Sequence, residues 1–126
     1  MSGHPLRVLV AEDDPINREI LTSLLEDVGC LVDTAENGAA ALSAARDKVY
    51  DVILMDMQMP VMNGPEAAGQ IRLDSRNRLT PIIAATANAF EEDREACRAA
   101  GMNDHLTKPI DPNILFEGVL KALQAK

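Results

Sequence analysis

Four of five short apolar runs in the sequence are each followed by side chains that can bind a cation or a phosphate. Glu12 and Asp13 follow the first run, and Asp56 follows the third. Thr86 follows the fourth run and Lys108 the fifth. If the runs are parallel strands, their carboxyl ends meet at one edge of a sheet, where open α/β proteins bind ligands. The pattern therefore predicts one site that combines carboxylates, a hydroxyl and an ammonium group.

The charges at this predicted site call for a cation. Glu12, Asp13 and Asp56 contribute about −3, and Lys108 returns about +1. Carboxylates held about 5 Å apart repel by roughly 3 kcal/mol per pair at an effective dielectric constant of about 20. Without compensation, one of them would take up a proton at a raised pKa. A divalent cation removes this conflict, and ligands that are all oxygens favour Mg²⁺ or Mn²⁺.

A magnesium site beside Lys108 and Thr86 is suited to phosphoryl transfer. The metal and the ammonium group neutralise phosphoryl oxygens, and the hydroxyl donates to a further oxygen. Asp56 is then the candidate nucleophile, which forms an aspartyl phosphate. Taken alone, Glu12 and Asp13 could form a solvated turn that complements a helix N-terminus. Because Asp56 and Lys108 are predicted at the same edge of the sheet, a functional role for Glu12 and Asp13 is favoured over a solvated turn.

The elements that must position these residues alternate between strand and helix. Continuously apolar runs such as 52–55 and 82–85 are typical of central strands in a parallel sheet, because helices cover both of its faces. Five strand–helix repeats with short connections predict an α/β fold, a doubly wound parallel sheet with helices on both faces. The expected strands are 6–11, 31–35, 51–55, 81–85 and 104–107, and the expected helices are 15–28, 38–48, 64–74, 88–100 and 111–124.

Local signals support the helix ends. Asp14 and Asp111 each precede a proline, the arrangement of a capping acid before the first helical residue. This capping role is the favoured interpretation of Asp14. Gly29 and Gly101 lie where helices are expected to end, and glycine is the usual residue in the left-handed conformation found there.

Composition narrows the class of protein further. The chain has 126 residues and a formal charge of −8, with only 2% aromatic residues. We expect one domain over residues 1–126 with a tail over about 1–5 and an aliphatic core. The negative charge argues against direct binding to nucleic acid or anionic lipid. No run approaches the roughly 18 apolar residues of a membrane span, so a cytoplasmic location is expected. Cys30 and Cys97 are expected to be buried free thiols.

These residues carry a resemblance to a known family. Glu12-Asp13, Asp56 within Met-Asp-Met-Gln-Met-Pro-Val-Met-Asn-Gly, Thr86-Ala87 and Lys108-Pro109 resemble the receiver domain of two-component response regulators. The match spans nearly the whole chain and keeps every landmark in order. The resemblance implies a flavodoxin-like sheet of five strands in the order 2-1-3-4-5.

The resemblance also implies a role for each residue of the site. Asp56 would accept a phosphoryl group from a phosphohistidine. Asp13 would ligate Mg²⁺ directly and Glu12 through water, with the Asp56 carboxylate and the Gln58 backbone carbonyl completing the protein ligands. Lys108 would pair with phosphoryl oxygens.

Further positions correspond to the switch of the family. Thr86 would move toward the phosphoryl group, and the small Ala87 would leave it a route of approach. His105 stands where many receivers place Tyr or Phe, so it is either a variant switch residue or a surface residue. Gln58 and Asn88 occupy positions that modulate loss of the phosphoryl group in the family. Pro109 follows Lys108 where the family forms a cis peptide.

The leading functional hypothesis is a phosphorylation-dependent switch that is not an enzyme as an isolated chain. Several segments resemble the receivers of hybrid sensor histidine kinases, and a stand-alone regulator is the alternative. A metal-dependent phosphohydrolase with an aspartyl nucleophile is a weaker rival. Such enzymes carry a second acid two residues after the nucleophile, and Gln58 occupies that position.

The expected partner is a histidine kinase or a histidine phosphotransfer domain, and the expected state is a monomer or weak dimer. The domain could be the cytoplasmic part of a membrane-anchored sensor kinase. Apolar residues at the start of the first helix lie beside the predicted site. Docking is therefore expected around Pro15, Ile16 and Ile20.

Overall fold

The computed structural model describes residues 5–87 and 91–124, without the side chains of 91–93. Strands and helices alternate throughout the described ranges. None of these helices combines the length and apolar composition needed to cross a membrane. In chain order the elements are β1 (Arg7–Ala11), α1 (Pro15–Asp27), β2 (Leu31–Ala35), α2 (Gly38–Asp47), β3 (Val52–Asp56), α3 (Gly64–Leu73), β4 (Ile82–Thr86), α4 (Glu91–Ala99), β5 (Asp104–Thr107) and α5 (Pro112–Gln124).

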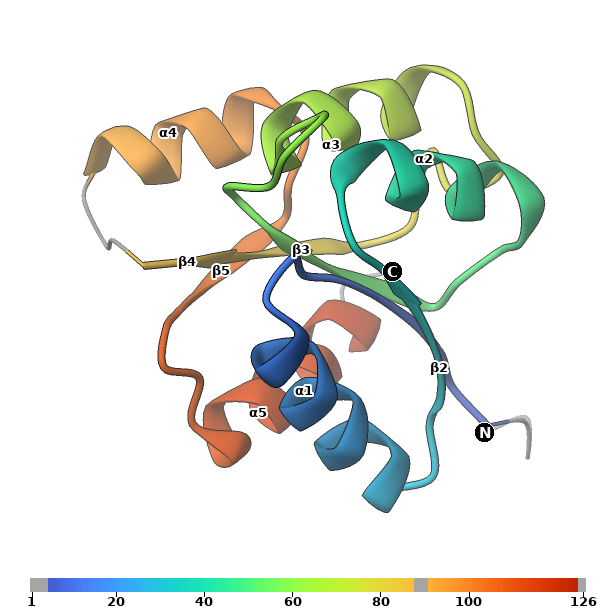
Figure 1. Cartoon of the computed structure of the whole chain (residues 1–126), viewed down its shortest axis with the longest axis vertical. Helices are drawn as coiled ribbons and strands as arrows, with labels where there is room; N and C mark the ends of the chain where they lie inside the picture. The colour runs from blue at the N-terminus through green and yellow to red at the C-terminus, as the bar shows by residue number, and fades with distance from the viewer. Residues whose placement is uncertain (1–4, 88–90, 125–126) are drawn as a thin grey trace.

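The strands form one parallel sheet in the order β2-β1-β3-β4-β5. Figure 1 shows α2, α3 and α4 above this sheet and α1 and α5 below it. The predicted doubly wound α/β fold and its strand order are therefore confirmed. Because all strands run the same way, the residues that follow β1, β3, β4 and β5 share one edge.

Alternating side chains of the central strands build two aliphatic cores. Leu9 and Ala11 of β1 belong to the core beneath α2, α3 and α4, whereas Val8 and Val10 belong to the core against α1 and α5. This explains the continuously apolar strand sequences, because every position is buried on one face or the other. Cys30 and Cys97 are buried and free, as expected, and lie in different cores.

The helix ends agree with the local signals. The Asp14 carboxylate accepts a hydrogen bond from the Ile16 amide at 2.9 Å, and Asp111 accepts one from the Asn113 amide at 2.8 Å. Gly29 and Gly101 both have a φ of +91°. The left-handed backbone expected at these helix ends is therefore confirmed.

Two strand boundaries differ from the expectation in a way that matters for the site. β3 and β4 end one residue later than predicted, at Asp56 and Thr86. Both residues still pair with the neighbouring strand, Asp56 with Ala85 and Thr86 with Thr107. The polar side chains are thus held by the sheet ladder itself.

The helix limits differ by small amounts. The first three helices end one residue earlier than predicted because Val28, Lys48 and Asp74 are their C-caps. β1 begins at Arg7, and α5 begins at Pro112 after its capping acid. The predicted helix 88–100 is described from Glu91 to Ala99, and residues 88–90 lie outside the described part of the chain, as do 1–4 of the expected tail.

The start of α3 is packed directly against the backbone of β3. The Gly64 amide donates to the Met57 carbonyl at 3.0 Å, and a Cβ atom at Gly64 would collide with the Asp56 carbonyl oxygen. By contrast, a Cβ atom at Gly69 in the same helix would meet nothing within 4 Å.

We therefore expect opposite effects from the same substitution at these two glycines. Gly64→Ala should destabilise the fold by roughly 1–3 kcal/mol, since backbone must move to admit the methyl group. Gly69→Ala should stabilise it by about 0.5–1 kcal/mol, because alanine is the better helix former. Urea unfolding followed by circular dichroism measures both. Equal effects would contradict the proposed contact.

Candidate phosphoryl-transfer site

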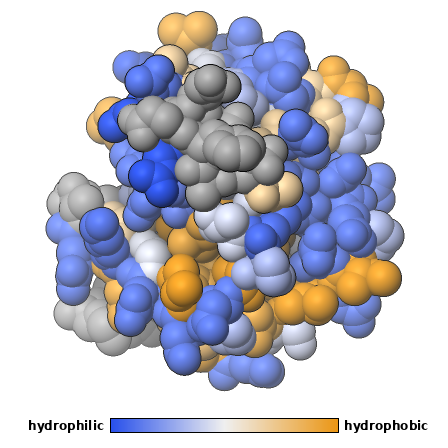
Figure 2. Space-filling view, turned by 90° about the vertical axis from the view of Figure 1, so that its left-hand side faces the viewer, coloured by the Kyte–Doolittle hydropathy of each residue, from blue (hydrophilic) through white to orange (hydrophobic). Residues whose placement is uncertain are grey.

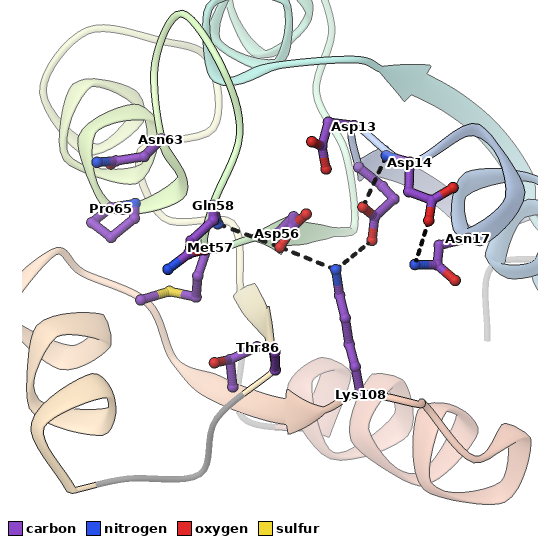
Figure 3. Close-up of a pocket in the computed structure, with 12 residues that line it drawn as sticks. Asp13, Asp14, Asn17, Asp56, Met57, Gln58, Asn63, Pro65, Thr86 and Lys108 are labelled. Carbon is purple, nitrogen blue, oxygen red and sulfur yellow. Dashed lines mark hydrogen bonds and ion pairs between the residues drawn. The ribbon is translucent and has the colours of Figure 1, made fainter.

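Lys108 lies at the centre of the charged edge. Its Nζ atom is 2.9 Å from Oε1 of Glu12 and 3.2 Å from Oδ1 of Asp56, and Figure 3 marks the contact between Lys108 and Asp56 with a dashed line. The Glu12 side chain is only 1% exposed and the Asp56 side chain 7%. One ammonium group therefore neutralises part of the charge of two buried carboxylates.

Backbone hydrogen bonds between neighbouring strands fix these positions. The Lys108 amide donates to the Thr86 carbonyl at 2.8 Å, which places the residue after β5 beside the end of β4. The Glu12 amide donates to the Ala35 carbonyl at 3.0 Å, and the Arg18 guanidinium donates to the Glu12 carbonyl at 2.9 Å. The sheet and the start of α1 thus hold the reactive groups from both sides.

Three carboxylates are close enough to share a cation. Oxygen atoms of Glu12, Asp13 and Asp56 lie within 4.8 Å of one another, with Asp13 exposed and the other two buried. Hard oxygen ligands of this kind suit Mg²⁺ or Mn²⁺. Gln58 lies two residues after Asp56, and its backbone amide donates a hydrogen bond to Oδ1 of Asp56 at 3.4 Å. The donor set therefore fits a magnesium ion, and the Gln58 carbonyl stays a predicted further ligand.

The electrostatics of Asp56 show the strain of this arrangement. Burial and then the neighbouring Glu12 carboxylate raise the pKa of Asp56 from 3.8 to about 7, although Lys108 opposes the shift. For Lys108, burial lowers the pKa, but Glu12 and Asp56 outweigh it and raise the pKa above its ordinary value. Without a cation the cluster favours holding a proton on Asp56, and a bound cation would favour its release.

The reactive residues line a cavity of about 550 Å³. Its walls include the predicted Glu12, Asp13, Asp56, Thr86 and Lys108, so the structure brings these side chains together. In Figure 3 the Thr86 hydroxyl does not point at the Asp56 carboxylate. The lining residues that the sequence reasoning did not assign to the site are Asp14, Asn17, Met57, Asn63 and Pro65.

One of these additional residues, Asn63, had a recognisable sequence signal. Asn63 begins a capping box, in which its side chain accepts from the Glu66 amide at 2.9 Å and Glu66 returns a bond. An Asn three residues before a Glu indicates such a cap. Asn17 donates to the Asp14 carboxylate at 3.3 Å, one turn into α1.

The predicted switch positions are only partly described. Ala87 is exposed and lines the cavity, whereas Asn88 lies outside the described residues. The Lys108–Pro109 peptide is cis. The His105 side chain is 26% exposed on β5, with Nδ1 4.0 Å from the Asp104 carboxylate. It does not line the cavity, so a switch role for His105 stays a prediction.

The predicted docking residues adjoin the charged site. Pro15 is exposed, and Ile16 and Ile20 are 69% and 51% exposed. A second hollow of about 150 Å³ lies beside them, lined by Ile20, Ile110 and others, and shares Glu12 and Lys108 with the main cavity. Figure 2 shows apolar surface gathered in its lower half, the level of α1 and α5.

Parallel strands in the order 2-1-3-4-5, with a lysine between two buried carboxylates at the carboxyl edge, define the receiver class of α/β domains. The chain belongs to this family, because the model of the response regulator receiver domain matches residues 8–120. It is a receiver domain of the two-component phosphorelay type, and its relatives include receivers of hybrid histidine kinases.

Relatives differ in how much of their own length the match covers. The sensor protein GacS of Pseudomonas syringae pv. syringae is 40% identical over 124 residues, which span 96% of this chain and 14% of GacS. An uncharacterized 14.6 kDa protein of Leptolyngbya boryana is 43% identical over 105 residues, 83% of this chain and 80% of that protein. The chain thus spans a small part of one relative and most of another.

Solved structures agree with the fold. The receiver domain of sensor histidine kinase PA1611 from Pseudomonas aeruginosa has a TM-score of 0.89 and 37% identity, covering 96% of this chain and 99% of that one. That structure holds a magnesium ion coordinated in its active-site cleft. The receiver of Ssk1 from Saccharomyces cerevisiae, crystallised with the phosphotransfer protein Ypd1, has a TM-score of 0.88 and 32% identity, covering 97% and 92%.

The raised pKa of Asp56 predicts a pH-dependent penalty in metal-free protein. Between its ordinary value of 3.8 and the folded value of about 7, the folded state binds more protons than the unfolded state. Stability from this group therefore falls as pH rises through that window. We expect Asp56→Asn to raise the thermal midpoint at about pH 8 and to change it little at about pH 4.

Adding Mg²⁺ should raise the wild-type midpoint at high pH and leave that of Asp56→Asn nearly unchanged, because the ion needs the ionised carboxylate. Asp27→Asn, at the far end of α1, serves as the control with the same charge change. Parallel midpoint–pH curves for wild type and Asp56→Asn would show that the carboxylate is not under this strain.

Proposed function

We propose that Asp56 is the phospho-acceptor of this receiver and that it takes a phosphoryl group from a phosphohistidine. The observation that carries the proposal is the burial of Asp56 beside Lys108, at 3.2 Å, within a three-carboxylate cluster. Glu12, Asp13, Asp56 and the Gln58 carbonyl would hold Mg²⁺. The ion would supply positive charge for the carboxylates and the phosphoryl oxygens.

In the proposed step, a carboxylate oxygen of Asp56 attacks phosphorus as the bond from phosphorus to the imidazole nitrogen breaks. The nitrogen leaves with the electron pair, and an aspartyl phosphate forms. Lys108 is placed to pair with a phosphoryl oxygen, since its Nζ atom already contacts Oδ1 of Asp56. The buried walls of β3 and β4 orient the carboxylate and limit access of water.

The same site supports a switch. Thr86 ends β4 at the cavity, and Ala87 is small and exposed beside it, so a hydroxyl can approach a new phosphoryl oxygen without a bulky neighbour. His105 on the adjacent β5 is the proposed partner in this movement. Slow loss of the phosphoryl group to water would be modulated by Gln58 and Asn88. The isolated chain is proposed to modify itself and not to turn over an external substrate.

Two parent architectures are compatible with the relatives. The match to GacS and other hybrid kinases favours a receiver module of a hybrid histidine kinase, which passes its phosphoryl group to a histidine phosphotransfer domain. The Leptolyngbya relative, of which the match covers 80%, favours a stand-alone regulator. The phosphohydrolase alternative is weaker, because the Gln58 amide cannot protonate a leaving group.

The docking surface for the phosphohistidine partner is proposed to be the start of α1. Ile16 and Ile20 present apolar side chains next to the hollow that shares Lys108 with the reactive cavity. A partner helix seated there would bring its histidine to the edge where Asp56 lies. The Ypd1–Ssk1 structure supports such a partner class, because it pairs a receiver of similar fold with a phosphotransfer protein.

Phosphorylation by a small donor tests the nucleophile directly. With Mg²⁺ and acetyl phosphate, we expect intact-mass analysis to show one phosphoryl adduct that is stable in acid and labile in base. Asp56→Asn should abolish it, and Lys108→Ala should reduce it strongly, because the phosphoryl oxygens lose their cation. Asp27→Asn should behave as wild type. An adduct retained in Asp56→Asn would refute the assignment.

Transfer from a protein donor tests the docking surface separately. Ile20→Asp should slow transfer from a phosphorylated histidine phosphotransfer domain at least about tenfold, since a charge is buried in an apolar contact. Phosphorylation of the Ile20→Asp variant by acetyl phosphate should be unchanged. Leu120→Asp places the same charge at a similarly exposed apolar position toward the end of α5, where residue 120 is 58% exposed. Equal slowing in both variants would contradict docking on α1.

A further inference from the structure

The connection between α3 and β4 is built on a buried side chain. Asn77 is 0% exposed. Its Nδ2 donates to the carbonyls of Ala45 at 2.7 Å and Lys48 at 2.6 Å. Its Oδ1 accepts from the Tyr50 amide at 2.7 Å and the Thr80 hydroxyl at 2.9 Å. Three of these bonds tie the connection to the end of α2 and the residues before β3, and the fourth, from Thr80, lies within the connection itself.

A second side chain fixes the connection from the other side. The Arg72 guanidinium donates to the carbonyls of Asn77, Arg78 and Thr80, at 3.2, 3.0 and 2.6 Å. It also reaches the Gly101 carbonyl at 2.9 Å and the Asn103 side chain at 2.8 Å. The backbone of residues 74–80 is therefore held in one shape, at the amino ends of the strands and away from Asp56.

Exposed apolar side chains lie on and beside this firmly held segment. Leu79 within it is 93% exposed, Leu73 at the end of α3 is 76% exposed, and Val49 before β3 is 57% exposed. Single exposed apolar residues need no explanation. Here, however, three of them border two adjoining hollows of about 480 and 400 Å³. In Figure 1 the connection is the yellow-green segment at the upper right.

The same hollows carry positive charge on an acidic protein. Arg76 and Arg78 line both of them, and within the described part of the chain neither guanidinium has an acidic partner. Arg46 lines the second hollow and is paired with Asp74 at 3.1 Å. Three guanidinium groups against one carboxylate leave a net charge of +2, on a chain whose total is −8.

We propose that this surface, formed by Val49, Leu73, Arg76, Arg78 and Leu79, docks an acidic peptide segment whose carboxylates are flanked by apolar residues. Arg76 and Arg78 line the wall that the hollows share, while Leu79 and Val49 border one hollow and Leu73 the other. A segment with central acids and an apolar side chain on each side would match both features.

The charge distribution favours a short segment over larger anionic partners. A membrane or a nucleic acid would meet the whole chain, with its charge of −8, and be repelled. A second copy would bring the same net repulsion. A short segment lies within about 10 Å of the arginines, the range over which salt leaves charges unscreened. Because residues 74–80 are already fixed, little ordering of this surface opposes binding.

A selection with random displayed peptides tests the proposal on the unphosphorylated chain. Peptides are selected on wild type after counter-selection on Arg76→Glu/Arg78→Glu. We expect enrichment of acidic peptides with flanking apolar residues, which shift the amide resonances of 73–80 in NMR spectra. Arg76→Gln/Arg78→Gln should weaken their binding about tenfold, and Leu79→Ser should weaken it with the thermal midpoint unchanged.

The matched control is Arg94→Ala/Lys121→Ala, which removes two exposed positive charges from α4 and α5 and should bind as wild type. The proposal is overturned if no peptide is enriched, if enriched peptides lack acids, or if their shifts map elsewhere. It is also overturned if the surface binds phosphatidylserine vesicles instead of peptide, or if sedimentation shows a dimer that Arg78→Glu dissociates.

Discussion

The structure depends on the close approach of buried carboxylates that share one ammonium group. Glu12 and Asp56 repel each other in a place that solvent barely reaches, and Lys108 contacts both at about salt-bridge distance. Such a cluster is unfavourable unless it is held in place and compensated. The parallel sheet provides the hold, because Glu12 and Asp56 follow or end strands that are paired on both sides, and Lys108 follows β5, which is paired with β4. Aliphatic cores above and below the sheet stabilise the whole against this local strain. The raised pKa of Asp56 reflects the unfavourable burial of its carboxylate beside Glu12, which the rest of the fold offsets.

Much of this could be predicted from the sequence because the signals are local. Apolar runs marked the strands, capping acids and glycines marked helix ends, and the reactive residues stood directly after the runs. The one-residue shift at Asp56 and Thr86 was not predictable in this way, because a polar residue ends an apolar pattern even when its backbone stays in the ladder. Hydrophobicity describes the side chain, whereas strand membership is decided by the backbone.

Features that join distant segments had no sequence signal. Arg72 and Asn77 look like ordinary surface residues, yet each makes several hydrogen bonds to carbonyls on other elements. Their roles depend on where the chain returns, which composition and spacing do not contain. Asn17 differs from these two residues, because its bond to Asp14 joins positions three apart in the chain. The proposed ligand role of the Gln58 carbonyl likewise rests on the family resemblance, because residue spacing does not report on a backbone carbonyl.

The contact between Gly64 and the Asp56 carbonyl has a consequence for how a signal can travel. With no side chain at Gly64, α3 and the end of β3 are in direct backbone contact, so this wall of the cavity cannot yield inward or outward independently. If Asp56 is phosphorylated as proposed, the added bulk and charge would be accommodated on the opposite wall, where Thr86 ends β4 and Lys108 follows β5. The wall formed by β3 and α3 is therefore the rigid side of the pocket, and displacement is expected on the side of β4 and β5. A glycine that carries no chemistry thereby sets the direction in which the domain can respond.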